Sequence, residues 1–288
     1  MNLTMLPELS ARYREGRLLP FIGAGLSAGV LWTQDGSQRA GVSWTALVDQ
    51  AARMIGFDDP DLLRFRGSEL QILEYFKIKK YNQFAELRNW FLREMSPPDS
   101  ALLASPVHKA LAQLTSCSLY YTTNYDDFLE RSFLLHGRPC RSVAIEAHIV
   151  EGLRLDSRQP DPLRCEIVKF HGDLANPERM VLSESDYEQR LRFAAVEDQR
   201  LKSDVLGRAL LFLGYSFRDW NVSYLFRLVN EEFGPLPGAP SGRRAYITVI
   251  DPSDFEYSLF RARNIEVISL SSARRTEGLV ELLEGLAS

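Results

Sequence analysis

The sequence predicts an α/β fold, with a mostly parallel sheet, helices on both faces and a helical insertion. Short apolar runs alternate along the chain with segments of helical periodicity, an order typical of parallel sheets. Several runs are apolar throughout rather than at every second position, as expected for strands that are buried on both faces. Glycine-containing turns follow several of these runs directly, where a strand would give way to a helix.

Seven short segments are expected to form the strands. The first ends at Gly23, and the most continuously apolar one ends at Gly214. Their length and apolar composition are typical of strands in the interior of a sheet. The expected strands are 18–22, 119–123, 141–145, 165–170, 209–214, 245–250 and 265–269.

Helical periodicity fills most intervals between these strands. Ser43 is placed to cap the helix that follows it. Residues 45–115 show no strand pattern, so we expect a helical insertion there, within a single domain spanning 1–288. Polar loops rich in proline or glycine are expected at 151–164 and 233–243. The expected helices are 3–15, 43–55, 68–95, 106–115, 126–135, 183–205, one after 214 and a short one that closes the chain.

Two features of the insertion have both structural and functional interpretations. Aromatic residues recur at helical spacing over 75–91, and we favour a core role for them over a partner-binding surface. Lys77, Lys79 and Lys80 form a small basic cluster, which we interpret as a solvated helix face.

The composition excludes several classes of protein. Hydrophobic residues make up 45% and charged residues 25%, which is typical of a globular chain. The net charge of −4 does not favour direct nucleic-acid binding. Cys117, Cys140 and Cys165 are an odd, sparse set, which argues against a disulfide framework. No signal peptide or membrane span is recognisable, so we expect a soluble, cytoplasmic protein with no membrane partner.

The glycine-rich turn GAGLSAG at 23–29 is the first candidate site. In a turn that opens a helix, backbone N–H groups can approach a pyrophosphate. The third glycine lies one position later than in the usual dinucleotide fingerprint. A plain tight turn between strand and helix is therefore the alternative.

Two further candidates end predicted strands. Asn124 and Asp126 stand where the strand 119–123 gives way to a helix, and an amide and a carboxylate there can hold a polar ligand. Taken alone, a helix-capping role for either residue is the simpler interpretation. His171 follows the strand 165–170 and precedes a glycine. Histidine can act as a general base near neutral pH, although a packed or solvated histidine is the alternative.

The last two candidates lie in the C-terminal half. Gly214 and Ser216 follow the strand 209–214, where Ser216 is either a ligand contact or an N-cap. Asp251 follows the strand 245–250 and either accepts from ribose hydroxyls or begins a turn with Pro252. All five turns lie at predicted carboxyl ends of strands, so they should converge on one edge of the sheet.

Taken in this order, the motifs resemble those of the sirtuin superfamily of NAD-consuming enzymes. The similarity extends from about Leu18 to about Ser269 and covers nearly the whole chain. Two segments, GVSW at 41–44 and VLSESDY at 181–187, resemble elements of the bacterial sirtuin-like branch. The resemblance implies a Rossmann-like sheet and NAD as the substrate. The motifs that carry it are GAGLS at 23–27, TNYD at 123–126, KFHG at 169–172 and GYS at 214–216.

The resemblance also implies roles for individual residues. Asn124 would position the nicotinamide ribose or the attacking water, Asp126 would lie near the nicotinamide amide, and His171 would be the general base. The glycine loop would hold the pyrophosphate. The implied NAD-binding residues are Gly23, Ala24, Gly25, Ser27, Thr123, Gly214, Ser216 and Asp251.

The chain departs from the family pattern in two places. Protein deacylases of this family usually hold a structural zinc with two Cys-x-x-Cys pairs, whereas this chain has three cysteines and no such pair. We therefore expect no zinc and no other metal site. Residues 31–39 look inserted after the glycine loop, and the usual Pro-x-Phe-Arg run is not recognisable.

The resemblance to the zinc-free branch implies an NAD+ hydrolase that releases nicotinamide and ADP-ribose, as the effector of a bacterial anti-phage defence system that depletes NAD+. An NAD-dependent protein deacylase and a non-catalytic module that senses NAD or ADP-ribose are the alternatives. A Rossmann oxidoreductase is disfavoured by the shifted glycine. The sequence does not separate hydrolysis from cyclisation.

An activity that depletes NAD+ must be inhibited in healthy cells. The chain leaves little length for a separate sensor domain. We therefore expect a homo-oligomer or a partner protein, such as a ring-forming ATPase or an Argonaute-type protein.

Overall fold

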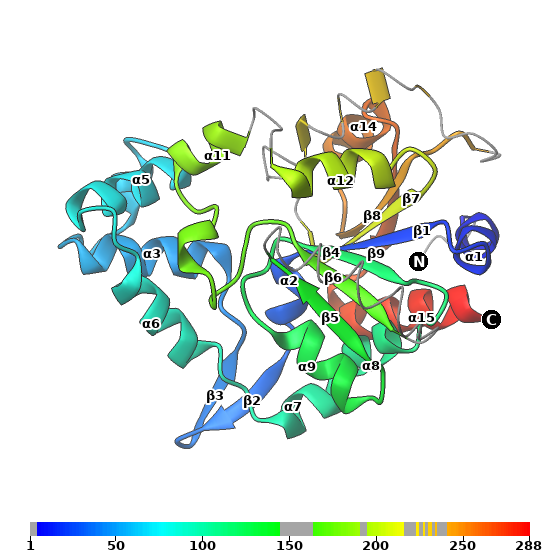
Figure 1. The fold of residues 1–288 in the computed structure, drawn as a ribbon, viewed down its shortest axis with the longest axis horizontal. Helices are drawn as coiled ribbons and strands as arrows, with labels where there is room; N and C mark the ends of the chain where they lie inside the picture. The colour runs from blue at the N-terminus through cyan, green and yellow to red at the C-terminus, as the bar shows by residue number, and fades with distance from the viewer. Residues whose placement is uncertain are drawn as a thin grey trace.

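A sheet of seven parallel strands forms the centre of the molecule. The computed structural model describes residues 5–144, 164–190, 195–215 and 241–288, with a few residues between 223 and 234. The strand order is β5-β6-β4-β1-β7-β8-β9, with every neighbouring pair parallel (Figure 1). The predicted α/β class is confirmed. The strands are β1 (Leu18–Ile22), β4 (Leu119–Thr122), β5 (Cys140–Val143), β6 (Cys165–Lys169), β7 (Ala209–Leu213), β8 (Ala245–Ile250) and β9 (Ile265–Leu270).

The middle strand, β1, marks a change of direction in the sheet. From β1 the chain builds β4, β5 and β6 on one side, and then crosses to build β7, β8 and β9 on the other. Ile22 is in register with Thr122 of β4 and with Leu213 of β7, so these strands end together. The carboxyl ends of strands at such a point are where open parallel sheets bind ligands.

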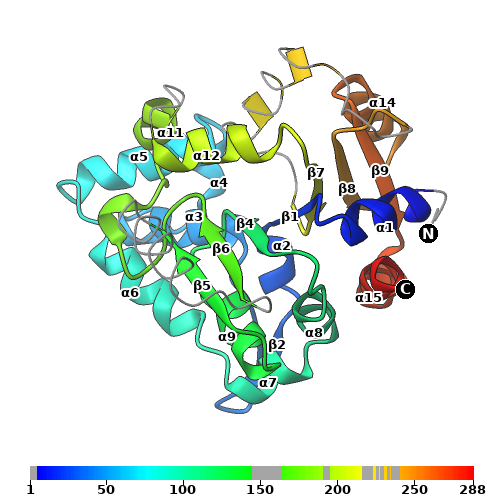
Figure 2. The ribbon, with the colours of Figure 1, turned by 45° about the vertical axis from the view of Figure 1, so that its right-hand side comes forward.

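Helices cover both faces of the sheet, as predicted (Figures 1 and 2). One face packs Ile22, Tyr120 and Leu211 in a core with Leu26 of the short helix α2 (Ala24–Ser27) and with apolar residues of four longer helices. The other face packs Phe21 and Phe212 against two helices. On the first face lie α1 (Leu6–Arg14), α8 (Pro106–Ala112), α9 (Phe128–Leu135) and α15 (Arg275–Ala287), and on the second α12 (Val196–Asp204) and α14 (Asp254–Ala262).

A separate group of helices, which we call the helical module, has a hydrophobic core of its own. This core includes Val48, Phe76 and Phe91, and it is joined by Phe128 of α9. Ser43 caps the first helix of the module as predicted, since its hydroxyl accepts from the Ala46 amide at 3.2 Å. The module comprises α3 (Trp44–Met54), α4 (Asp61–Arg64), α5 (Glu69–Lys79), α6 (Ala85–Glu94) and α7 (Asp99–Ala104).

The predicted insertion over 45–115 is helical, but its last helix, α8, packs on the sheet rather than in the module. The aromatic residues Phe76 and Phe91 are buried, so the core interpretation is confirmed for them. Residues 31–39, which looked inserted, form most of an antiparallel hairpin of β2 (Leu31–Gln34) and β3 (Ser37–Ala40). The single-domain organisation of 1–288 stays a prediction.

The single helix predicted over 183–205 is wrong. The structure has α11 (Glu184–Arg190) and α12 instead, and the backbone at Ala195 is extended, with ψ of 146°. The helical run over 68–95 is likewise divided into α5 and α6, because Tyr81 and Asn82 adopt positive φ values of 52° and 63°. The loop 151–164, except for its last residue, and the helix expected after 214, except for a few residues, lie outside the described residues.

The cysteines are distant in sequence, but two of them are neighbours in the sheet. Cys140 and Cys165 are register partners across β5 and β6. Burial raises the pKa of Cys140 to about 12 and that of Cys165 to about 11, so both thiols stay protonated near neutral pH. Among the described residues, no helix combines the length and apolarity that a membrane span requires.

A buried histidine in α8 makes the stability of the fold depend on pH. Burial, with a smaller contribution from His136, lowers the pKa of His108 from 6.5 to about 4. The unfolded chain therefore takes up this proton first, and stability is lost as the pH falls from about 6.5 toward 4. Between pH 7.5 and 5 the expected loss in the free energy of unfolding is about 2 kcal/mol.

Urea unfolding of the parent and of His108→Asn at pH 7.5 and pH 5 measures the contribution of His108 to the free energy of unfolding. The Asn side chain can keep a hydrogen bond to Ser105, whose Oγ lies 2.8 Å from His108 Nδ1, but it does not titrate. The difference in pH dependence between the two proteins should equal the histidine contribution. Identical pH dependence in both would contradict the assignment.

Candidate functional site

A cavity of about 900 Å³ lies between the carboxyl edge of the sheet and the helical module. Its sheet side is formed by the turns after β1, β4, β6 and β7, which confirms that these predicted motifs converge. Its other side includes Trp44 of α3, Gln71 of α5 and Tyr187 of α11. The predicted site residues that line it are Ala24, Gly25, Thr123, Asn124, Asp126, His171 and Gly214.

The glycine loop is packed directly against the turn after β7. The Gly25 amide donates to the Gly214 carbonyl at 2.9 Å, and the Gly23 amide donates to Leu213 at 3.0 Å. A Cβ on Gly23 would lie 2.5 Å from the Gly214 oxygen, and one on Gly25 would lie 2.7 Å from it. Both positions therefore require glycine because two backbones meet there, and both amides are already used within the protein.

Asn124 presents a buried acceptor at the cavity wall. Its side chain is oriented by Ser27, because Nδ2 donates to the Ser27 hydroxyl at 3.0 Å. The residue is only 5% exposed, and its Oδ1 has no partner among the described residues. A buried polar atom without a hydrogen bond costs about 1–3 kcal/mol, so Oδ1 is poised to accept from a bound hydroxyl or water. Ser27 does not line the cavity but holds the amide that does.

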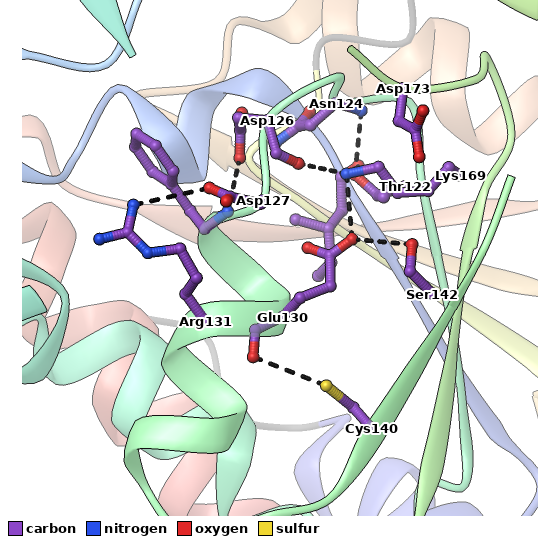
Figure 3. Close-up of polar contacts among 12 residues, drawn as sticks. Thr122, Asn124, Asp126, Asp127, Glu130, Arg131, Cys140, Ser142, Lys169 and Asp173 are labelled. Atoms are coloured by element: carbon purple, nitrogen blue, oxygen red, sulfur yellow. Dashed lines mark hydrogen bonds and ion pairs between the residues drawn. The ribbon is translucent and has the colours of Figure 1, made fainter. Parts of the chain in front are cut away.

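Asp126 is buried beside a lysine (Figure 3). Its carboxylate accepts from the Phe128 amide at 3.1 Å, so the capping interpretation also describes this residue. Burial raises the pKa of Asp126, and the nearby Lys169 ammonium opposes this shift. Lys169 donates to the Asp126 carbonyl and lies 3.2 Å from the Glu130 carboxylate. The sequence drew attention to Lys169 only as part of the KFHG motif.

His171 follows β6 and is 2% exposed. Its position is set by the backbone on both sides. The Val181 amide donates to the His171 carbonyl at 3.0 Å, and the next residue, Gly172, has φ of +77°. The edge of the Tyr187 ring packs against the imidazole, with centroids 5.2 Å apart. A predicted base thus lines the same cavity as the acceptor of Asn124.

The remaining predicted residues have different outcomes. Gly214 lines the cavity with φ of +60°, and a Cβ there would lie 2.6 Å from the Leu26 nitrogen. Ser216 lies outside the described residues. Asp251 is exposed and does not line the cavity, and its carboxylate accepts from the Ser272 amide at 3.3 Å. The role of Asp251 stays a prediction.

The helical module and α11 contribute cavity residues that site prediction missed. Trp44 and Tyr187 line the wall that faces the sheet. Both fall in segments that resemble bacterial sirtuin-like proteins. That resemblance was the one feature of the sequence from which their place in the site could have been predicted. Among the described residues, no group of three or more His, Cys, Asp or Glu side chains is arranged to hold a metal ion.

The chain is similar to several known proteins. A family model described as "SIR2-like domain" matches residues 118–268. "NAD(+) hydrolase ThsA" of Acinetobacter baumannii is 24% identical over 80% of this chain and 42% of its own length, and its namesake in Bacillus cereus is 26% identical over 74% and 40%. "Defense-associated sirtuin 2" of Bacillus subtilis is 23% identical over 78% of this chain and 20% of its own.

The chain thus spans about two fifths of the length of the ThsA relatives. A solved chain described as "Structural Basis for the Mechanism and Regulation of Sir2 Enzymes" aligns over 98% of both chains, with 13% identity and a TM-score of 0.42.

Proposed function

The chain belongs to the family of SIR2-like domains, and from this premise we propose that it is an NAD+ hydrolase. The observation that carries the proposal is the buried Asn124 Oδ1, which has no hydrogen-bond partner in the part of the chain that the structure describes and lies in the wall of the same cavity as His171. Relatives named NAD(+) hydrolase, 24% and 26% identical over most of this chain, support the same activity.

The proposed reaction breaks the bond between the ribose C1′ and the nicotinamide nitrogen. The bonding electrons leave with nicotinamide, which becomes neutral, and C1′ passes through an oxocarbenium-like state. The oxygen of a water then bonds to C1′, and one proton is released. NAD+ and water therefore give nicotinamide, ADP-ribose and a proton, with no redox change.

Three side chains of the cavity have roles in this reaction. Asn124 Oδ1 accepts a hydrogen bond from the attacking water or from a ribose hydroxyl, while Ser27 holds the amide in place. His171 takes the proton, directly or through the ribose hydroxyls. Asp126 lies near the nicotinamide amide, and Lys169 beside it favours its charged form. Gly25, Gly214 and Thr123 form the wall for the pyrophosphate and ribose.

The biological setting that we propose is bacterial anti-phage defence by depletion of NAD+. The relative named "Defense-associated sirtuin 2" supports it. We also propose that a homo-oligomer or a partner protein, such as a ring-forming ATPase or an Argonaute-type protein, holds the activity off until infection. Light scattering of the purified chain gives its oligomeric state.

Chromatography of the products tests the activity. The purified chain is incubated with NAD+, with and without an acyl-lysine peptide, and we expect equal amounts of nicotinamide and ADP-ribose in both cases. Asn124→Ala should lower kcat on the order of 10²-fold, because the water or ribose loses its positioning acceptor. Asn230→Ala is the control. It removes a side-chain amide that donates a hydrogen bond to the Arg263 carbonyl outside the cavity, and it should retain the parent rate.

Each other outcome identifies another function. A requirement for the acyl-lysine peptide would make the protein a deacylase, and a cyclic product would make it a cyclase. Binding of NAD+ without turnover, also in the presence of the proposed partner, would make it a sensing module.

A further inference from the structure

The short helix α11 connects the helical module to the segment that carries His171. At its N-terminal end, Lys77 of α5 contacts three oxygens: Ser183 Oγ at 3.2 Å, Ser185 Oγ at 3.1 Å and Asp186 Oδ1 at 2.7 Å. An ammonium group has three N–H donors, so this set uses its full capacity. The Lys77 side chain is 20% exposed, which corrects the interpretation of this lysine as part of a solvated face.

The second oxygen of Asp186 organises the chain just before α11. Asp186 Oδ2 accepts from the Leu182 amide at 3.2 Å, the Ser183 amide at 2.9 Å and the Ser183 hydroxyl at 2.8 Å. One carboxylate thus joins the helix to the preceding segment with one oxygen and to the helical module with the other. Lys77 supplies the charge that this carboxylate faces.

The C-terminal end of α11 is attached to the sheet side of the cavity. Arg190 donates to the Phe170 carbonyl at 2.9 Å and pairs with the buried Asp198 of α12 through Nε at 3.1 Å. Phe170 directly precedes His171. The helix is therefore tied to the module at one end and to the backbone beside His171 at the other.

Tyr187 lies between these two attachments. It follows Asp186 directly, lines the cavity, and packs the edge of its ring on the His171 imidazole. The Val181 amide, which precedes the Asp186-capped turn, donates to the His171 carbonyl. A movement of α11 would thus reach His171 both through the tyrosine ring and through the backbone.

From this geometry we propose that Lys77 and Asp186 are positioning residues, which set the His171 imidazole for proton transfer by fixing α11 to the helical module. The role in turnover rests on the proposed NAD+ hydrolase activity. Neither residue lines the cavity, so their removal should act through His171 rather than through contact with the substrate. The effect should therefore fall on kcat more than on KM.

The test compares Lys77→Met with Lys80→Met. Lys80 is a matched control on the same helix, since its ammonium pairs with Glu86 at 2.7 Å and does not contact α11. We expect Lys77→Met to lower kcat about tenfold with KM changed by less than about twofold. Asp186→Asn keeps acceptor capacity for the Leu182 and Ser183 amides but loses the charge, so it should cause a similar loss. The double variant should lose less than the product of the two single losses, because both substitutions break the ion pair between Lys77 and Asp186.

Hydrogen exchange gives a second measurement that does not need turnover. Amides over 171–183 should exchange faster in Lys77→Met than in the parent, and should be unchanged in Lys80→Met. An unchanged kcat in Lys77→Met, an equal loss in Lys80→Met, or a loss confined to KM would overturn the positioning role. A parent that releases no nicotinamide, either alone or with the proposed partner, would instead contradict the proposed function. In that case, hydrogen exchange over 171–183 that is unchanged in Lys77→Met would still overturn the proposal that Lys77 fixes α11 and the segment around His171.

Discussion

Replacing His171 with alanine is expected to lower kcat for nicotinamide release by about 10²–10⁴-fold, which is the usual contribution of a general base. The imidazole lines the same cavity as Asn124, whose Oδ1 accepts no hydrogen bond from any described residue. It is packed against Tyr187 and is 2% exposed, so its position is defined before a substrate arrives. Steady-state kinetics with NAD+ measure the effect, and KM should change much less than kcat.

Two further variants separate chemistry from folding. His171→Asn retains more of the side-chain volume and should lose a similar factor in kcat with a thermal midpoint close to that of the parent. His136→Ala removes a histidine that does not line the cavity and should retain the parent kcat. Turnover by His171→Ala at the parent rate would exclude His171 as the base.

The largest expected effect on stability comes from Lys169→Met. The Lys169 ammonium is 2% exposed and pairs with Glu130 at 3.2 Å, while it also donates to the Asp126 carbonyl (Figure 3). Removing the cation leaves the Glu130 carboxylate without the positive charge that it faces. Breaking a buried pair from one side typically costs about 3–5 kcal/mol. Urea unfolding at pH 7.5 measures this loss in the free energy of unfolding.

The matched control removes the charge of both partners. Lys169→Met combined with Glu130→Gln should recover much of the lost stability, because position 130 no longer carries a buried charge without its cation and the Gln amide can still contact the Ser142 hydroxyl, which donates to Glu130 at 3.1 Å. If the single variant lost less than about 1 kcal/mol, or the double variant were less stable than the single one, a stabilising role for the pair would be rejected.

The strands could be predicted because burial on both faces leaves a continuous apolar run in the sequence. Leu18–Ile22 and Ala209–Leu213 are buried at every position, and both were located to within one residue. The hairpin of β2 and β3 was missed, because only Trp32 of β2 is buried and its exposed residues carry no apolar pattern. The division between α11 and α12 was missed because residues 183–205 contain no proline or glycine that would mark it in the sequence.

The sheet side of the site could be predicted for a related reason. Turns that follow parallel strands must meet at one edge, so Asn124 and His171 were expected to lie together without knowledge of their contacts. The opposite wall depends on how the helical module packs, and no local pattern encodes that packing. Lys77 is an example of a contact that could not be predicted from the sequence. Its partner, Asp186, lies more than one hundred positions later in the chain, and only the fold brings the two side chains together.

The pairing of β1 with β7 also bears on how the protein is made in the cell. The glycine loop follows β1, yet its packing partners, Gly214 and Tyr215, are translated much later. At about 5–20 residues per second, the loop waits many seconds for its second wall. Nascent chains that end before β7 would lack that wall, so the proposed NAD+ hydrolysis would begin only after β7 and the turn that follows it have been made. Synthesis order would thus protect the producing cell from toxic fragments.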